Sequence, residues 1–237
     1  MTAIEYRGSE LSLFARATNW KMYTKEVVSP YVKGAVLEVG AGIGTVTKIL
    51  YSGQLLAWVC LEPDRSLYHQ LSKTVCTRRL PNCRAINGTL ADLRSTDQFD
   101  TIVYVDVLEH IEDDRGELLL AAEHLRQDGN LVVLAPAHQW LYSPFDSAIG
   151  HFRRYGRNTL SSALPSGVVL VKTMYLDTVG LSASALNKLL LRRMKPSIRQ
   201  IVLWDRFMVP LSRPLDRLSG YRIGKSLLMV AQKRGKS

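Results

Sequence analysis

Residues 36–45 read VLEVGAGIGT, an apolar run that passes into three closely spaced glycines and then into a stretch with helical character. A glycine has no Cβ and adopts positive φ at little cost, so a turn built from Gly40, Gly42 and Gly44 lets the main chain approach a ligand closely. A buried strand that feeds a helix through such a turn is typical of α/β proteins, in which crossover helices join parallel strands. The segment therefore constrains the fold class and marks the first candidate binding site.

The alternation of apolar runs with helical periodicity continues along most of the chain. Short apolar runs bounded by turn residues are typical of strands buried in a parallel sheet. We predict seven strands, at Ala35–Val39, Leu56–Leu61, Cys83–Asn87, Thr101–Asp106, Asn130–Ala135, Val168–Met174 and Ser226–Gln232. The pattern predicts an α/β fold with a Rossmann-like, mostly parallel seven-stranded sheet and flanking helices.

Helix signals lie between these strands. Acidic residues favour helix N-termini, and Asp is a common N-cap. On these grounds we expect helices that begin at Gly44, at Asp64 after Pro63, and at Asp113 or Asp114, the last with an apolar stripe that runs through Leu125 to a turn at 128–129. A further helix is predicted from Leu11 to Val28, which gives an N-terminal helical cap over residues 1–33.

One segment does not fit the simple alternation. Residues 177–220 lie between the last two predicted strands, where a tight hairpin would suffice, and their apolar residues recur at helical spacing beside lysines and arginines. We expect a basic helical insertion within a single domain that spans residues 1–237. Such a segment forms a lid over a substrate, a membrane-surface contact or a dimer interface, or packs on the core as an ordinary helical pair.

Charge is distributed unevenly along the chain, whose net charge is +10. Residues 1–149 contain 14 Lys and Arg against 18 Asp and Glu, whereas residues 150–237 contain 17 against 3. A basic excess confined to one region favours an anionic partner: a phosphorylated small molecule, a lipid headgroup surface or nucleic acid. A basic surface that only serves solubility is the alternative.

Other patterns exclude several classes of protein. Cys60, Cys76 and Cys83 have no CxxC or Cys/His spacing, so we predict neither disulfides nor a metal site. No stretch approaches the roughly 18 apolar residues that a membrane span needs, and the N-terminus lacks the layout of a signal peptide. We therefore expect a cytoplasmic protein.

The residues around the glycines narrow the choice of ligand. The dinucleotide fingerprint G-x-G-x-x-G has a glycine where this chain has Thr45, and no G-K-[ST] follows as in a P-loop. Glu38, two residues before the turn, puts a carboxylate beside it, which disfavours a diphosphate and suits a cation. Glu62 ends the second predicted strand, where acidic residues bind the ribose diol in nucleoside-binding α/β folds. Ribose and a cation without a diphosphate describe S-adenosylmethionine.

Four segments together resemble the class I S-adenosylmethionine-dependent methyltransferases, in particular a bacterial subgroup. They are VLEVGAGIGT, CLEPD, FDTIVYVDVLEHIEDD and LAPAHQWLYSPFDSAIGHFRRY, and the resemblance as a whole extends from the N-terminal helix to the last strand. The resemblance implies S-adenosylmethionine as the cofactor, S-adenosylhomocysteine as its product, and a last strand inserted antiparallel.

The resemblance also implies cofactor contacts. Glu62 would bind the ribose hydroxyls and Pro63 would lie beside the adenine. The methionine part would be held by Glu38, Gly40, Ala41, Gly42 and Gly44, and lined by Asp106 and Val107. Where relatives carry an acidic residue for the adenine amino group this chain has Thr89, so that the Thr89 hydroxyl, the backbone at Leu90 or the Asp92 side chain would serve. Trp20 or Tyr23 would cover the cofactor, with ordinary packing as the alternative.

Methyl transfer from a sulfonium is an in-line displacement, so the protein chiefly aligns the acceptor in a dry pocket. A hydroxyl acceptor must also lose its proton, a task that suits histidine. Three histidines fall after the fourth and fifth predicted strands: His110 and His151 are the candidate catalytic residues, and His138 is a candidate substrate contact.

A basic and aromatic run follows His151. Arg153 and Arg154 would neutralise a phosphate or carboxylate of the substrate, with Tyr155 beside them. Alternatively, the two arginines would form ion pairs with the acidic run at residues 112–114.

These observations predict a methyltransferase that acts on an oxygen or nitrogen, or a carboxylate, of a small molecule: a natural product, a sugar, or an anionic or lipid-linked compound. A nicotinamide-dependent oxidoreductase is the alternative, but the chain lacks both a glycine at position 45 and a Y-x-x-x-K lysine after Tyr155. A nucleic-acid-directed methyltransferase would use the basic half, yet aromatic residues do not punctuate the basic positions as stacking platforms would, and no known nucleic-acid motif is present. A peripheral membrane contact stays open.

Overall fold

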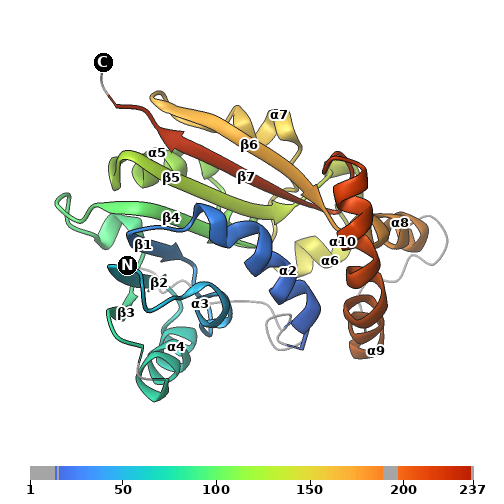
Figure 1. The fold of residues 1–237 in the computed structure, drawn as a ribbon, viewed down its shortest axis with the longest axis horizontal. Helices are drawn as coiled ribbons and strands as arrows, with labels where there is room; N and C mark the ends of the chain where they lie inside the picture. Colours follow the sequence, from blue (N-terminus) through green and yellow to red (C-terminus); the bar gives the residue numbers. More distant parts are fainter. Residues whose placement is uncertain (1–13, 15, 79, 189–196, 236–237) are drawn as a thin grey trace.

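The computed structural model describes residues 14, 16–78, 80–188 and 197–235. Seven strands form one sheet in the order β3-β2-β1-β4-β5-β7-β6 (Figure 1). They are β1 Ala35–Val39, β2 Ala57–Glu62, β3 Cys83–Asn87, β4 Phe99–Val105, β5 Leu125–Pro136, β6 Val168–Leu176 and β7 Ser226–Lys233. The predicted fold class is confirmed.

Pairing directions place the ends of the strands. Strands β1 to β5 pair in parallel, and β7 lies antiparallel between β5 and β6, as predicted for the last strand. Since β6 therefore runs in the direction of β5, the carboxyl ends of all strands but β7 meet at one edge of the sheet, which we call the carboxyl edge.

Strand β5 begins at Leu125, not at Asn130 as predicted. The preceding helix α5 (Asp114–Glu123) correspondingly ends at Glu123, before the predicted end of its apolar stripe. Leu125 is fully buried and pairs with Phe99 of β4. It follows the apolar residues of α5 at helical spacing in the sequence, but it belongs to the strand.

The remaining helices are α2 Thr18–Val28, α3 Thr45–Leu50, α4 Arg65–Thr77, α6 Pro144–Ala148, α7 Arg157–Ser161, α8 Thr178–Leu186, α9 Ile198–Leu203 and α10 Val209–Leu218. The predicted N-caps are confirmed, since Asp64 accepts a hydrogen bond from the Leu67 N–H and Asp113 from the Gly116 N–H. Of the predicted N-terminal helix, residues 11–13 and 15 lie outside the described residues.

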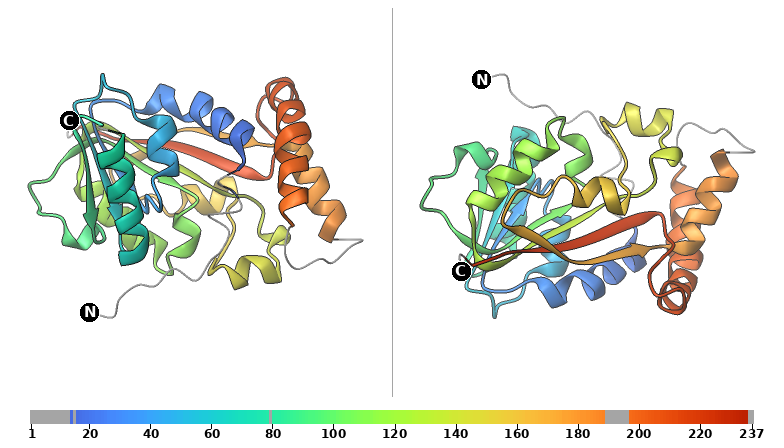
Figure 2. Two further views of the ribbon diagram at one scale, coloured as in Figure 1. Left: turned by 90° about the horizontal axis from the view of Figure 1, so that it is seen from below. Right: turned by 90° about the horizontal axis from the view of Figure 1, so that it is seen from above.

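Helices cover both faces of the sheet (Figure 2). On one face α5 and α7 bury Leu118 and Leu160 against residues such as Leu37. On the other face α2 and α4 bury Tyr23 and Leu71. Neighbouring strand residues alternate between these two cores, as expected for a sheet buried on both sides.

The predicted helical insertion before the last strand is confirmed. It leaves β6 at Asp177 and returns at Ser226, so α8, α9 and α10 stand together at the carboxyl edge (Figures 1 and 2). A π-helical turn at 204–208 joins α9 to α10. No helix in the described ranges is long and apolar enough to cross a membrane.

Buried aspartates anchor the insertion. Asp205 accepts hydrogen bonds from the main-chain N–H of Asn19 and Trp20 and so caps α2. Asp216 accepts from the Tyr23 hydroxyl at 2.8 Å, and Asp177 accepts from the Trp204 indole at 2.7 Å. These three are the only acidic residues in 150–237, and because all are buried, the exposed charges of that region are positive.

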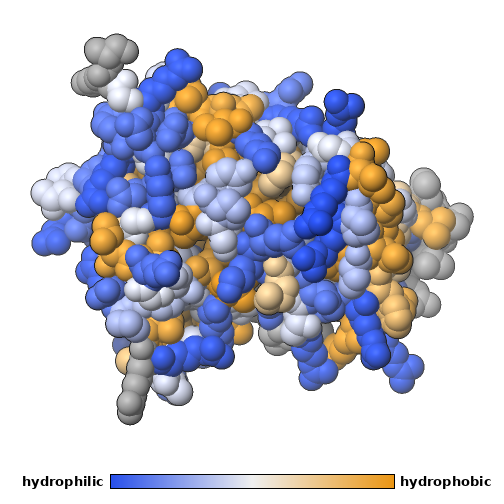
Figure 3. Space-filling model, viewed as in Figure 1, coloured by the Kyte–Doolittle hydropathy of each residue, from blue (hydrophilic) through white to orange (hydrophobic). Residues whose placement is uncertain are grey.

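Several apolar side chains of the insertion are exposed. Figure 3 shows hydrophobic residues along α9 and α10 at the right of the molecule. We call this row the α9–α10 stripe; it consists of Ile198, Val202, Phe207, Leu211, Leu215 and Leu218, each at least 43% exposed.

Candidate active site at the carboxyl edge

The glycine turn follows β1 at the carboxyl edge. Gly40, Gly42 and Gly44 have φ of 64°, 56° and 77°, a region in which residues with a side chain are strained. A Cβ on Gly40 would lie 2.7 Å from the Val107 side chain, so a larger residue would displace the loop after β4. Ala41 is buried, and its N–H donates to the Leu61 carbonyl of β2.

Glu62 ties the end of β2 to this turn. Its carboxylate accepts hydrogen bonds from the main-chain N–H of Gly42 at 2.7 Å and of Asp64 at 2.9 Å. Burial raises the pKa of Glu62, and these two hydrogen bonds oppose the shift. Each carboxylate oxygen keeps a second lone pair, so the predicted contact to a ribose is compatible with both bonds.

Glu38 belongs to β1, and its side chain is buried between β2 and α3. Its Oε2 accepts hydrogen bonds from the Thr47 hydroxyl at 2.6 Å and the Trp58 indole at 2.8 Å, while its buried Oε1 has no hydrogen-bond partner among the described residues. Burial raises the pKa of Glu38 to about 7. These contacts fix the strand and helix that flank the glycine turn.

The predicted adenine contacts lie after β3. Thr89 begins the 3₁₀ turn at 90–92, and both its main-chain N–H and its hydroxyl donate to Asp92. Asp92 is thereby turned back onto Thr89 in a capping box. Leu90 is buried, and Pro63 is partly exposed beside Asn87, whose amide donates to the Pro63 carbonyl.

Asp106 and Val107 follow β4 at the same edge. Asp106 has a φ of 55°, and its N–H donates to the Leu134 carbonyl. Asp106 is exposed, yet desolvation by the surrounding protein raises its pKa to about 6, and the charges of His151 and Lys225 oppose this shift. Val107 contacts the glycine turn, as described above.

Trp20 and Tyr23 face the insertion. Tyr23 is fully buried with its hydroxyl on Asp216, and the Trp20 ring lies 5.7 Å from the Trp204 ring. For Tyr23 these contacts match the packing alternative. Trp20 is partly exposed.

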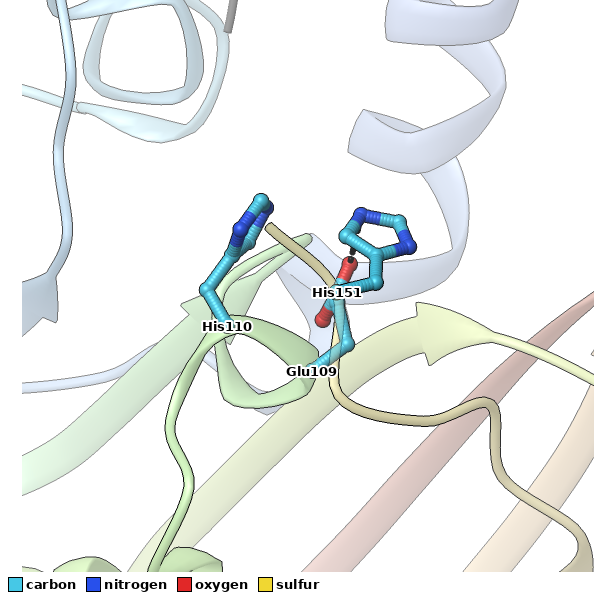
Figure 4. A group of neighbouring side chains, drawn as sticks. All are labelled: Glu109, His110 and His151. Atoms are coloured by element: carbon cyan, nitrogen blue, oxygen red, sulfur yellow. Dashed lines mark ion pairs between the residues drawn. The ribbon is translucent and has the colours of Figure 1, made fainter. Parts of the chain in front are cut away.

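The structure brings His110 and His151 together with Glu109 (Figure 4). The two rings meet edge to face with centroids 4.5 Å apart. His151 Nδ1 lies 3.0 Å from Asp146 Oδ1, and its Nε2 lies 3.8 Å from Glu109 Oε1. Burial and the neighbouring His151 lower the pKa of His110 to about 4, so His110 is neutral at pH 7.

Glu109 is fully buried at the centre of this group. Burial and the nearby Asp106 raise its pKa well above the ordinary value, and neither carboxylate oxygen has a hydrogen-bond partner among the described residues. The segment that carries His151 is tied to it, because the Phe152 N–H donates to the Glu109 carbonyl at 2.8 Å.

The arginines are engaged within the protein. Arg153 pairs with Asp114 at 2.8 Å, as the ion-pair alternative predicts. Arg154 instead forms a two-pronged contact with Asp146, at 2.8 and 3.1 Å, and not with the acidic run. Tyr155 is buried, and its hydroxyl donates to Asp114.

The contacts of His138 differ from those of His110 and His151. Its Nε2 lies 2.9 Å from the Gly224 carbonyl, and its ring stacks on Tyr175 with centroids 5.0 Å apart. His138 thus connects the loop after β5 to the end of the insertion.

Two residues of the group were absent from the sequence prediction. Glu109 is adjacent to His110 in LEHIEDD, so its proximity was visible but its burial was not. Asp146 belongs to a capping box with Ser143, a spacing that signals a helix start. Its contacts with His151 and Arg154 depend on the folded loop.

Comparisons with known proteins agree with this architecture. Residues 37–131 match a family model described as a methyltransferase domain. No curated protein matches the chain in sequence.

Solved structures share the fold at low sequence identity. A chain in the complex of the Haloferax volcanii Trm112 methyltransferase activator aligns with a TM-score of 0.66 and 14% identity, over 98% of this chain and 99% of that one. Coclaurine N-methyltransferase, bound to N-methylheliamine and S-adenosylhomocysteine, aligns with a TM-score of 0.61 and 14% identity, over 90% of this chain and 72% of that one. N-methyltransferase NodS from Bradyrhizobium japonicum, bound to S-adenosylhomocysteine, aligns with a TM-score of 0.58 and 16% identity, over 94% of this chain and 88% of that one.

The domain match favours methyl transfer over the nicotinamide-dependent alternative. The match of residues 37–131 to a methyltransferase domain, on a fold shared with solved methyltransferase structures, supports a methyltransferase that uses S-adenosylmethionine.

Proposed function

We propose that the enzyme transfers the methyl group of S-adenosylmethionine to an oxygen or nitrogen of a small-molecule acceptor that is anionic or lipid-linked. The observation that carries the proposal is the contact between Val107 and Gly40, which joins the glycine turn to the loop bearing Glu109 and His110. A candidate cofactor site and a group of titratable side chains are thereby neighbours at one edge of the sheet.

On the cofactor side, the glycine turn holds the methionine part and Glu62 binds the ribose hydroxyls. Because Glu62 already accepts the Gly42 N–H, the same side chain shapes the turn and contacts the cofactor. Two structural neighbours of low sequence identity, both bound to S-adenosylhomocysteine, support this placement.

On the acceptor side, His110 and His151 act on the acceptor's nucleophilic atom. A hydroxyl or ammonium group must lose a proton before or during the displacement, whereas the sulfonium leaving group needs no acid. Arg153 and Arg154, although paired with aspartates, supply positive charge near His151.

The insertion supports an anionic or lipid-linked acceptor. Arg199, Arg206 and Arg222 of the insertion are exposed and have no exposed acidic neighbour from residues 150–235, whereas the exposed Arg217 pairs with Glu26 of α2. The α9–α10 stripe lies among these arginines. A helix with one apolar and one basic face binds at the surface of an anionic bilayer.

Labelling identifies the acceptor class. We would incubate the full chain with methyl-labelled S-adenosylmethionine and a cell extract, and separate lipid, aqueous small-molecule and nucleic-acid fractions. Label in either of the first two fractions, lost in His151→Ala, supports the proposal. Label that is released only by nuclease would contradict it in favour of a nucleic-acid acceptor.

A further inference from the structure

Glu109, His110 and His151 converge from two segments that the fold brings together (Figure 4). Glu109 and His110 belong to the 3₁₀ turn 108–110 after β4, and His151 lies in the loop after α6. Each residue offers one carboxylate oxygen or ring nitrogen, and these atoms all lie within 4.8 Å of one another. The spacing allows one ion to contact all three after small side-chain movements.

The Glu109 carboxylate has a distant contact with His151 Nε2, at 3.8 Å, but no hydrogen bond from the described residues. It is fully buried. Arg154, a cation in the same region, directs its guanidinium to both oxygens of Asp146. Burying a carboxylate that accepts no hydrogen bond is costly, so this position favours a bound cation.

The His151 ring is oriented by a second carboxylate. Asp146 accepts from His151 Nδ1 and is itself held by the Ser143 hydroxyl at 2.7 Å and by Arg154. His151 Nε2 is thereby directed toward Glu109. A carboxylate behind a histidine is the arrangement that fixes the ring of a metal ligand in protein metal sites.

We propose that Glu109, His110 and His151 bind a divalent transition-metal cation of the Zn²⁺, Co²⁺ or Mn²⁺ type. One carboxylate and two imidazoles are a donor set for such ions, whereas Mg²⁺ and Ca²⁺ prefer oxygen donors alone. Three protein ligands leave coordination positions open, and Val107 places the cation next to the glycine turn.

The role of the cation in catalysis rests on the proposed function. A cation at this site makes an oxygen atom of the acceptor the nucleophile. A hydroxyl that binds the cation loses its proton to solvent more readily. The oxygen–methyl bond then forms as the sulfur–methyl bond of the cofactor breaks, which leaves S-adenosylhomocysteine. The histidines would act on the acceptor through the cation and not as bases themselves.

Cobalt binding tests the site without a cofactor or an acceptor. We would titrate the chelator-treated full chain with Co²⁺, follow its visible absorption, and repeat the titration by calorimetry with Zn²⁺. We expect one ion per chain and an affinity at least about tenfold weaker in Glu109→Gln and in His151→Ala. His69→Ala, which removes an exposed histidine on α4, should match the wild type.

Calorimetry with S-adenosylhomocysteine on the same samples separates the two proposals. Retained cofactor binding in Glu109→Gln shows that this variant is folded. Absent Co²⁺ binding in the wild type, or an affinity unchanged by both substitutions, would overturn the metal site while leaving the methyltransferase proposal intact. Metal binding without S-adenosylhomocysteine binding would support the metal site and contradict the methyltransferase proposal.

Discussion

The Glu62 carboxylate accepts a hydrogen bond from the Gly42 main-chain N–H at 2.7 Å, which ties the end of β2 to the turn after β1. Its other oxygen accepts from Asp64 at the start of α4. A single buried side chain therefore sets the relative position of two loops at the carboxyl edge, and any ligand in the turn contacts a surface that Glu62 shapes.

Glu62→Ala should weaken S-adenosylhomocysteine binding at least about tenfold, because a hydrogen bond to a charged group contributes roughly 1.5–3 kcal/mol. Equilibrium dialysis with labelled ligand measures the affinity. Glu123→Ala, on the exposed end of α5, is the matched control and should bind as the wild type does. An unchanged affinity in Glu62→Ala would contradict the placement of the ribose.

Glu38→Gln should stabilise the fold at pH 8 and have little effect at pH 4. The folded pKa of Glu38 is about 7 against an ordinary value of 4.5, so the folded state holds the proton more tightly. Stability from this group is present below pH 4.5 and falls as the pH rises to 7, by about 3 kcal/mol in all. Urea unfolding at both pH values tests this; an equal effect at both would exclude the assigned cause.

Asp146→Asn should show the opposite pH dependence. Hydrogen bonds from His151 and Arg154 outweigh burial and hold the pKa of Asp146 well below its usual range. Its contribution is present above an unfolded pKa of about 3.9 and is lost as the pH falls below that value. Breaking this buried ion pair should cost about 3–5 kcal/mol at pH 7, measured by urea unfolding, with a smaller difference near pH 3. A loss independent of pH would point to packing instead.

These pairs also show how far the sequence predicts the structure. The bounds of β1 and β3 follow from apolar runs that end at glycine or asparagine, and the caps Asp64 and Asp113 follow from local spacing. Leu125 misleads because helical and strand periodicity coincide there.

Long-range polar contacts cannot be predicted from local sequence patterns. That Arg154 pairs with Asp146, and that Tyr23 bonds Asp216 across 193 residues, depends on how loops fold over the sheet. The candidate site could be located from the order of strands and motifs, but its hydrogen bonds could not.

Leu211→Glu should reduce binding to vesicles of anionic lipid. Leu211 lies in the α9–α10 stripe and is 58% exposed, so the substitution removes apolar contact and adds a repelled charge. Vesicle co-sedimentation, with and without anionic lipid, measures the effect. Leu56→Glu alters a side chain that is 70% exposed at the other end of the sheet and should bind normally. Equal binding of both variants and the wild type would remove the support for a lipid-linked acceptor.

Calorimetric titration of the full chain with S-adenosylhomocysteine, followed by competition with NAD, tests most directly which ligand the glycine turn binds. We predict that S-adenosylhomocysteine binds with one site per chain and that NAD neither binds nor displaces it. Binding of NAD in its place would contradict the account of the turn and of the site built around it.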